Sequence, residues 1–272
     1  TPQAVVDNAI AAFDPYFNHP NNSLKNYYEV LSYNNVTINS ILPRISPSEV
    51  YVYNGGNRQY FNIEDSNTYA RRTRETELLS GAVEGAANKF DLSGKDLDIN
   101  DDGYADSVSF LICGNNEDTW GGLLWPHSWN LDSIDGTSAS SYIGGVKIGD
   151  YSFNFSSSIN VGVLAHEMGH VLGAPDLYHY EYDFVPVGKW DLMSSNTNIP
   201  QYMLTYMRSK YIGGIGSSQA LDIVTSGIYQ LAPVSTSVSN ADVLAYKIRL
   251  AEKPNEYFMI EYRNPNISTR YD

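Results

Sequence analysis

Cysteine is nearly absent from the sequence, since Cys113 is the single one among 272 residues. The chain therefore cannot form an internal disulfide. This scarcity does not exclude secretion, because a chain of this length can bury a full core without disulfides. Cys113 ends an apolar run and no paired histidine motif accompanies it, so we expect a buried strand residue rather than a nucleophile.

Positive charge is also scarce. The sequence has 17 Lys and Arg residues against 31 Asp and Glu residues, which gives a net charge of −14 and a pI near 4.6. Nucleic-acid binding needs clustered Lys and Arg to contact phosphates, so we expect no nucleic-acid partner. The one basic cluster, Arg71, Arg72 and Arg74, is predicted to be the solvated start of a helix.

Long hydrophobic runs are missing as well. No apolar run reaches the roughly 18 residues that a membrane-spanning helix needs, so we expect no membrane span. No signal peptide is visible after Thr1, and we expect one to have been removed.

What the sequence does contain is a metal-binding pattern, HEMGHVLGAPD, over residues 166–176. Residues four apart share one face of a helix, so His166 and His170 can both direct an imidazole nitrogen at one metal ion. Glu167 is placed to take a proton from a metal-bound water. This pattern predicts a catalytic zinc site. It favours that interpretation over the alternative, in which the two histidines are ordinary residues of the core.

The residues after this helix predict the third ligand. Gly173 suits a helix end with positive φ, and Pro175 cannot continue a helix. The chain is therefore expected to turn and bring Asp176 back toward the histidines, which leaves a fourth position on zinc for water. His179 is the main competitor, and the spacing favours Asp176.

The zinc string and the downstream sequence Trp190-Asp191-Leu192-Met193 together resemble the immune inhibitor A family of secreted bacterial metallopeptidases, within the metzincin-like zincins. Further stretches resemble the same family: 23–33, 98–106, 125–129 and 256–263. The resemblance implies that Met193 lies in a tight turn beneath the zinc, as a structural residue rather than a ligand. Ser194 departs mildly from the residues that family members often have after this methionine.

The resemblance also has implications for the whole protein. It implies a secreted or cell-surface enzyme, and an inhibitory pro-segment outside this chain. Family members usually continue into another strand where this chain reaches Asp272, so the chain is expected to be truncated there.

We predict an α+β fold with a zincin or metzincin-like catalytic domain, made of a twisted mixed sheet, the active-site helix and a smaller lower subdomain. The catalytic domain is placed at 1–215, with its upper subdomain reaching to about 173 and its lower one starting at 174. A β-rich C-terminal segment follows at 216–272.

The hydrophobic patterns predict individual elements. Helices are expected at 3–13, 23–32 with Ser23 as N-cap, about 74–90, about 159–172 and 201–211. Strands are expected at 36–42, 50–53, 107–113 as a central strand, 228–232, 243–250 and 256–262. Residues 114–157 are expected to form loops and short strands along one wall of a cleft.

Two further sites are weaker predictions. Asp98, Asn100, Asp102 and Asp106, with an intervening glycine, resemble a calcium-binding loop, although Ser109 replaces the expected bidentate Glu. The alternative is a polar hairpin turn, and the two are evenly balanced.

His127, between two tryptophans, could line the substrate cleft or stabilise the transition state. A buried histidine that bonds to the backbone is the favoured interpretation.

The predicted function is zinc-dependent endopeptidase activity on protein or peptide substrates, with Glu167 as general base. Calcium is a second cofactor only under the calcium-loop interpretation of residues 98–106. Two alternatives remain. One is a binding or adhesion module on an inactive peptidase scaffold, against which the retained Glu167 argues. The other is a zinc amidohydrolase of non-peptide substrates.

Overall fold

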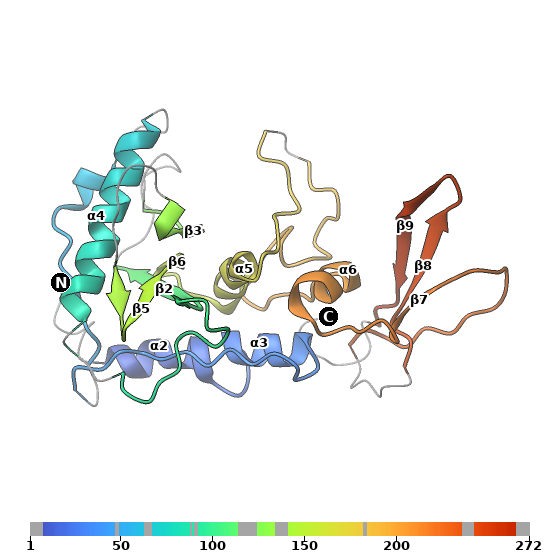
Figure 1. The fold of residues 1–272 in the computed structure, drawn as a ribbon, viewed down its shortest axis with the longest axis horizontal. Coiled ribbons are helices and arrows are strands. Elements are labelled where there is room, and N and C mark those ends of the chain that lie inside the picture. The colour runs from blue at the N-terminus through green and yellow to red at the C-terminus, as the bar shows by residue number, and fades with distance from the viewer. Residues whose placement is uncertain are drawn as a thin grey trace. The chain divides into compact units, whose positions relative to one another are not determined.

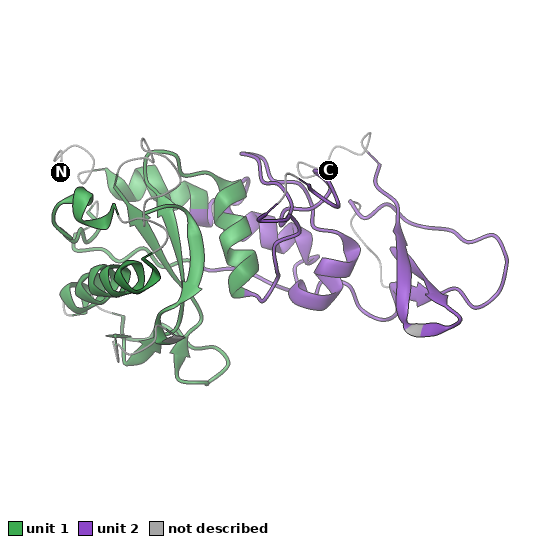
Figure 2. Cartoon of the chain, turned by 90° about the horizontal axis from the view of Figure 1, so that it is seen from above, with its two compact units in different colours: residues 1–16, 40–171 green, residues 17–39, 172–272 purple. Residues whose placement is uncertain are grey.

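The structure is a computed structural model, and it describes residues 8–46, 49–62, 67–87, 89, 92–113, 124–133, 141–181, 184–235 and 242–264. The chain divides into two compact units (Figure 2). Unit 1 comprises residues 1–16 and 40–171, and unit 2 comprises residues 17–39 and 172–272. Both helices and strands are present, so the predicted α+β class is confirmed.

Unit 1 contains two small sheets and the helices α4 (Thr68–Ala86) and α5 (Val161–Val171) (Figure 1). One sheet has the order β2-β6-β3, where β2 is Val108–Ile112, β6 is Asp150–Phe155 and β3 is His127–Asn130. The other has the order β1-β5-β4, with β1 at Tyr104–Ala105, β5 at Val146–Ile148 and β4 at Tyr142–Ile143. Short 3₁₀ helices occupy Arg58–Phe61 and Leu131–Ser133. Helix α2 (Ala9–Asn18) begins in unit 1.

The core of unit 1 lies between α4 and the β2-β6-β3 sheet. The side chain of Asn67 caps α4 by accepting a hydrogen bond of 3.1 Å from the main-chain N–H of Ala70. Leu79 and Val83, one helical turn apart, are buried against Tyr151 and Phe153 of β6.

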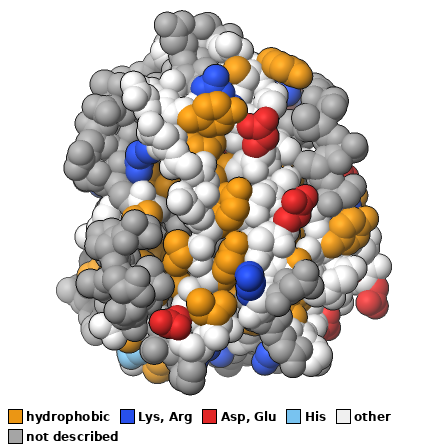
Figure 3. Space-filling model, turned by 90° about the vertical axis from the view of Figure 1, so that its left-hand side faces the viewer, with side chains coloured by type: hydrophobic (Ala, Val, Ile, Leu, Met, Phe, Trp, Pro, Cys, Tyr) orange, Lys and Arg blue, Asp and Glu red, His pale blue; other side chains and the backbone are white. Residues whose placement is uncertain are grey.

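Figure 3 shows one face of the molecular surface. Hydrophobic side chains are scattered over it, and only a few separate Lys, Arg, Asp and Glu side chains lie between them.

Unit 2 contains a helical region and a third sheet. Helix α3 (Leu24–Leu31) is capped by Ser23, whose hydroxyl accepts a hydrogen bond of 3.0 Å from the main-chain N–H of Asn26. This confirms the predicted N-cap. Helix α6 (Thr205–Met207) continues into a π-helical turn, Arg208–Ile212. The sheet has the order β7-β8-β9, formed by Ala220–Asp222, Ala245–Leu250 and Lys253–Glu261.

Several predicted helix boundaries are wrong. Helix α4 starts six residues before the predicted 74, because Asn67 rather than a later residue supplies the cap. The predicted helix at 201–211 starts only at Thr205, because the carboxylate of Asp191 holds the main-chain N–H of Leu204 at 2.6 Å. Helix α2 (Ala9–Asn18) ends five residues after the predicted end at 13, and the predicted start at 3 lies outside the described residues.

Some predicted strands are also wrong. Residues 36–42 and 50–53 form no strand, and a single bridge joins Arg44 to Val50. The hydroxyl of Ser32 donates to the main-chain carbonyl of Val36 and accepts from the N–H of Val36. Both main-chain groups of Val36 are therefore used, and Val36 cannot pair with a neighbouring β-strand. Residues 228–232 form no strand, and Ile228 is fully exposed.

Among the described strands of its sheet, the predicted central strand lies at an edge. Of the three described strands in its sheet, β6 is central and β2 pairs with it in parallel. Cys113 follows β2 and is exposed, so the prediction of a buried cysteine is wrong. No helix in the described part of the chain is long and apolar enough to cross a membrane.

In this part of the chain the two units divide between Val171 and Leu172. The predicted upper and lower subdomains, which meet at 173 and 174, stay a prediction. The wider division into 1–215 and 216–272 stays a prediction.

Candidate metal centre

Helix α5 carries the zinc string and runs from Val161 to Val171, close to the predicted 159–172. The side chain of Asn160 accepts a hydrogen bond of 3.0 Å from the main-chain N–H of Val163, which satisfies one free donor at the helix start. Gly173 follows the helix with a φ of 90°, a backbone conformation that favours glycine. The local sequence therefore determines both ends of this helix.

Three metal-binding side chains converge at the end of α5. Among the described residues, the one group of three or more His, Cys, Asp or Glu side chains suited to hold an ion is His166, His170 and Asp176. One ligand atom from each lies within 4.8 Å of the other two. The two imidazole rings are perpendicular, with centroids 4.8 Å apart.

The chemistry of this group fits a divalent transition metal. Two imidazole nitrogens and one carboxylate oxygen are a ligand set of catalytic zinc sites, in which the fourth position is left for water or substrate. His179 is not in the group. Its ring stacks on that of Phe184, with centroids 5.8 Å apart, and its main-chain N–H donates to the Phe184 carbonyl.

Asp176 has a hydrogen-bond partner that the sequence analysis missed. The hydroxyl of Tyr180, four residues later, donates to Oδ2 of Asp176. Outer partners of this kind orient a ligating carboxylate and modulate its affinity for metal. The signal in the sequence was a tyrosine in the turn after the zinc string, which is too common a feature to identify.

Glu167 lies next to the first histidine and is buried, with 6% of its surface exposed. His166 is similarly buried, at 5%. A carboxylate in such surroundings is shielded from bulk water, and it lies beside the first residue of the converging group.

Met193 is fully buried in a tight turn. Its main-chain carbonyl accepts a hydrogen bond of 2.9 Å from the N–H of Leu177, the residue after Asp176. Its own N–H donates to the carboxylate of Asp191 at 2.7 Å. The turn around Met193 is thus hydrogen-bonded to the segment that contains Asp176.

Asp191, another residue that the sequence analysis did not single out, organises this turn. Its carboxylate also accepts from the N–H of Leu204, and its side chain is fully buried. Burial raises the pKa of Asp191 to about 6, although the N–H groups of Leu204 and Met193 act in the opposite direction.

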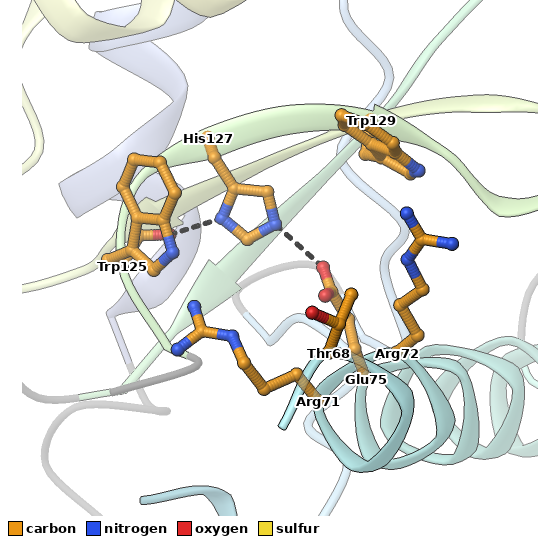
Figure 4. Close-up of a pocket in the computed structure, with 7 residues that line it drawn as sticks. All are labelled: Thr68, Arg71, Arg72, Glu75, Trp125, His127 and Trp129. Atoms are coloured by element: carbon orange, nitrogen blue, oxygen red, sulfur yellow. Dashed lines mark hydrogen bonds and ion pairs between the residues drawn. The ribbon is translucent and has the colours of Figure 1, made fainter. Parts of the chain in front are cut away.

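His127 bonds through both of its ring nitrogens (Figure 4). Nδ1 lies 2.7 Å from the main-chain carbonyl of Trp125, and Nε2 lies 2.7 Å from Oε1 of Glu75. The hydroxyl of Tyr151 donates to the same oxygen at 2.5 Å. This matches the favoured interpretation of a histidine that bonds to the backbone. The two ring nitrogens are directed at the Trp125 carbonyl and the Glu75 carboxylate.

The acidic loop at 98–106 satisfies its own backbone. The carboxylate of Asp98 accepts from the N–H groups of Asp102, at 3.0 Å, and Gly103, at 2.8 Å. The side chain of Asn100 donates to Asp102, and Asp106 accepts from the N–H of Ile99. These bonds are those of a polar turn, and calcium binding there stays a prediction.

Comparisons with known proteins agree with the zinc string. The catalytic-domain model of the family "Immune inhibitor A peptidase M6" matches residues 10–203. Immune inhibitor A from Bacillus thuringiensis subsp. alesti is 30% identical over 122 residues, which is 40% of this chain and 18% of that protein. Pre-pro-metalloprotease PrtV from two strains of Vibrio cholerae serotype O1 is 28% identical over 202 residues, which is 64% of this chain and 21% of that protein.

The matched parts thus cover about one fifth of the length of these curated relatives. The family match, by contrast, covers most of the present chain and includes the helix with His166, Glu167 and His170, as well as Asp176 and Met193. It begins in helix α2 and ends shortly before α6. The chain therefore belongs to the immune inhibitor A family of M6 peptidases.

Proposed function

We propose that this chain is the catalytic part of a secreted zinc-dependent endopeptidase. The observation that carries the proposal is the convergence of His166, His170 and Asp176 within 4.8 Å at the end of α5, beside a buried Glu167. The family membership supports a metallopeptidase. The tight turn at Met193 supports a metzincin-like arrangement of the site.

Each residue has a distinct role in this proposal. His166, His170 and Asp176 would hold the ion, and the hydroxyl of Tyr180 would orient the Asp176 carboxylate. When bound, zinc polarises the scissile carbonyl and lowers the pKa of water toward 7. Glu167 accepts the proton of the attacking water and returns it to the leaving amine.

Met193 and Asp191 act on the site through the backbone. The hydrogen bond from Leu177 to the Met193 carbonyl restrains the segment next to Asp176. The carboxylate of Asp191 holds the turn in place by accepting a hydrogen bond from the N–H of Met193. These two residues position the ligands and take no part in proton transfer.

The full-length protein is proposed to be longer than this chain, since the matched relatives are about five times longer than the matched parts. One relative is named as a pre-pro-metalloprotease. By analogy, we infer a signal peptide for secretion and an inhibitory pro-segment. Protein substrates are inferred from the peptidase family.

The two alternatives are a binding module on an inactive scaffold and a hydrolase of non-peptide amides. A binding module has no need of a buried carboxylate beside the ligands, so Glu167 disfavours it. Both alternatives predict zinc binding without cleavage of protein substrates.

The test is to measure metal content and casein hydrolysis for the chain and for Glu167→Ala. We expect about one zinc ion per chain and cleavage by the unaltered chain, while Glu167→Ala keeps zinc and loses activity by several orders of magnitude. His179→Ala serves as a control, because this histidine lies outside the converging group. A chain that binds zinc with both histidines replaced would contradict the ligand assignment.

A further inference from the structure

Strand β9 reaches the start of helix α6 through its last residue, Glu261. Oε2 of the Glu261 carboxylate accepts a hydrogen bond of 2.6 Å from the main-chain N–H of Thr205. Oε1 accepts from Nε of Arg263 at 2.7 Å. The side chains of Glu261 and Arg263 are 16% and 11% exposed. Both oxygens of a largely buried carboxylate are therefore bonded, and salt in the solvent screens these charges little.

A second carboxylate binds the neighbouring N–H group of the same helix. Asp191 is fully buried and accepts from the main-chain N–H of Leu204 at 2.6 Å, and Leu204 directly precedes Thr205. The first N–H groups of a helix have no acceptor within the helix, and negative groups are stabilised beside them. Asp191 and Glu261 thus hold one helix start together, although they come from segments that are far apart in the sequence.

Arg263 lies close to both carboxylates. Burial is the largest cause of the raised pKa of Asp191, and among the smaller causes the charge of Arg263 lowers this pKa while that of Glu261 raises it. The guanidinium group of Arg263 also lies over the ring of Trp190, 5.8 Å from its centroid. Trp190 directly precedes Asp191, so the end of β9 contacts this segment as well as the start of α6.

The Asp191 carboxylate also connects the helix start to the metal centre. It accepts from the N–H of Met193 at 2.7 Å, and the Met193 carbonyl accepts from the N–H of Leu177, next to Asp176, at 2.9 Å. All of these residues belong to unit 2. A displacement of Glu261 can therefore reach Asp176 through a contiguous series of short hydrogen bonds to main-chain groups.

The contacts of Glu261 lie outside the part of the chain that matches the family. The match ends at residue 203, so Thr205, Glu261 and Arg263 all lie beyond it. The sequence predicts a catalytic domain at 1–215 and a separate β-rich segment after it. The hydrogen bond between Glu261 and Thr205 joins these two predicted parts.

We propose that Glu261 is a positioning residue for the metal centre. Its carboxylate, held by Arg263, fixes the start of α6. Through Asp191 this fixes the turn at Met193 and the segment that contains Asp176. The third sheet is then a working part of the catalytic unit. This inference rests on the metal site of the proposed function and does not depend on which bond is cleaved.

The alternative is that Glu261 only stabilises α6 and β9. In that case its replacement lowers stability but leaves zinc binding by the folded protein unchanged. A positioning role changes zinc binding in a protein that is still folded, so the Kd for zinc distinguishes the two.

The first variant is Glu261→Gln, which keeps the shape of the side chain and removes its charge. It should raise the Kd for zinc about threefold to tenfold, because groups bonded directly to a ligand account for roughly 10–100-fold and Glu261 acts through several bonds. Chelator competition gives the Kd, at a temperature at which thermal unfolding shows each variant to be folded. Arg263→Gln keeps the bond from Thr205 to Glu261 and removes the other partner, so it should raise the Kd by less.

Two control variants separate positioning from general stability. Asp222→Asn makes the same change of charge on the same sheet, where the Asp222 carboxylate lies 2.7 Å from Nε of Arg249. Ser23→Ala removes a helix cap in the same unit. Neither residue belongs to the series of bonds from Glu261 to Asp176, so both variants should keep the Kd of the unaltered chain.

Casein hydrolysis separates this proposal from the proposed function. Zinc binding by Glu261→Gln as tight as that of the unaltered chain, or equal losses in the controls, would refute the positioning role, while cleavage by the unaltered chain leaves the peptidase standing. Weaker zinc binding in Glu261→Gln alone, with no cleavage by the unaltered chain, would refute the peptidase and leave the positioning role. An unaltered chain that binds no zinc would overturn both.

Discussion

The main-chain carbonyl of Met193 accepts a hydrogen bond of 2.9 Å from the main-chain N–H of Leu177, the residue that follows Asp176. The methionine side chain is fully buried, so its packing fixes the turn from which this carbonyl projects. The position of Asp176, the proposed third ligand, therefore depends on a residue outside the converging group of His166, His170 and Asp176.

Met193→Ala should destabilise the chain and weaken metal binding together. Removal of a fully buried methionine side chain costs about 2–5 kcal/mol, because it leaves a cavity. Met193→Leu nearly conserves the volume and should cost less than about 1.5 kcal/mol. Urea unfolding and zinc titration of both variants test this. Weak zinc binding by the leucine variant at unchanged stability would instead indicate a direct role of the sulfur.

Asp176 and His179 can be separated as third ligands by paired substitutions. Asp176→Asn should raise the Kd for zinc more than about 100-fold, since substitutions of outer partners alone cost about 10–100-fold. His179→Ala should leave the Kd unchanged, because its ring stacks on Phe184 rather than joining the other histidines. Chelator competition measures both values. The opposite order of effects would make His179 the ligand.

Tyr180→Phe should weaken zinc binding by about tenfold, the lower end of the range for outer partners, because Tyr180 is 81% exposed. The substitution removes only the hydroxyl that donates to Asp176. Tyr178→Phe is the control, because it removes a hydroxyl from the ring that packs against Tyr180, with centroids 5.5 Å apart. Equal effects of the two substitutions on the Kd would exclude a specific role of Tyr180.

The converging metal group was predictable from the sequence because all of its members lie within eleven residues. Helical spacing places His166 and His170 on one face, and Gly173 ends the helix with the positive φ that its sequence suggested. The cap of α3 at Ser23 was predictable for the same reason. In these cases local chemistry and the final structure agree.

The parts that could not be predicted depend on contacts between distant residues. Glu75 and His127 are 52 residues apart, and no periodic pattern relates them. Strand β6 alternates polar and aromatic residues but is almost wholly buried, whereas the region 114–157 that contains it is predicted as loops and short strands. The helix predicted at 201–211 was shortened by Asp191, whose carboxylate holds Leu204.

Asp191 should make stability depend on pH. Its pKa is about 6 in the folded chain, against an ordinary 3.8, so the folded state binds the proton more tightly. The stability contributed by the protonated group is then present at low pH and is lost as the pH rises from about 4 to about 6, by roughly 3 kcal/mol. Asp191→Asn lacks this titration.

The measurement is the difference in unfolding free energy between the unaltered chain and Asp191→Asn, from urea unfolding without metal between pH 4 and 7.5. Subtraction removes the titrations that the two proteins share. A difference that grows with pH in favour of the unaltered chain would show a lowered pKa, with the hydrogen bonds from Met193 and Leu204 outweighing burial.

Glu75→Gln should lower both stability and the pKa of His127. The carboxylate accepts from Tyr151 and His127, and an amide oxygen in its place loses the charge that stabilises the imidazolium. A raised histidine pKa contributes stability that is complete below the unfolded value and disappears as the pH rises through the folded value. The unaltered chain should thus exceed Glu75→Gln in stability by about 2–4 kcal/mol at pH 5 and by less at pH 8.

NMR titration of the His127 ring in both proteins gives the pKa directly, and urea unfolding at pH 5 and pH 8 gives the stability difference. Tyr151→Phe is the matched control, because it removes the other donor to the same oxygen without changing the charge of Glu75. It should reduce stability by about 1 kcal/mol at both pH values. A His127 pKa that is the same in the unaltered chain and in Glu75→Gln would mean that the Glu75–His127 contact is not an ion pair in solution.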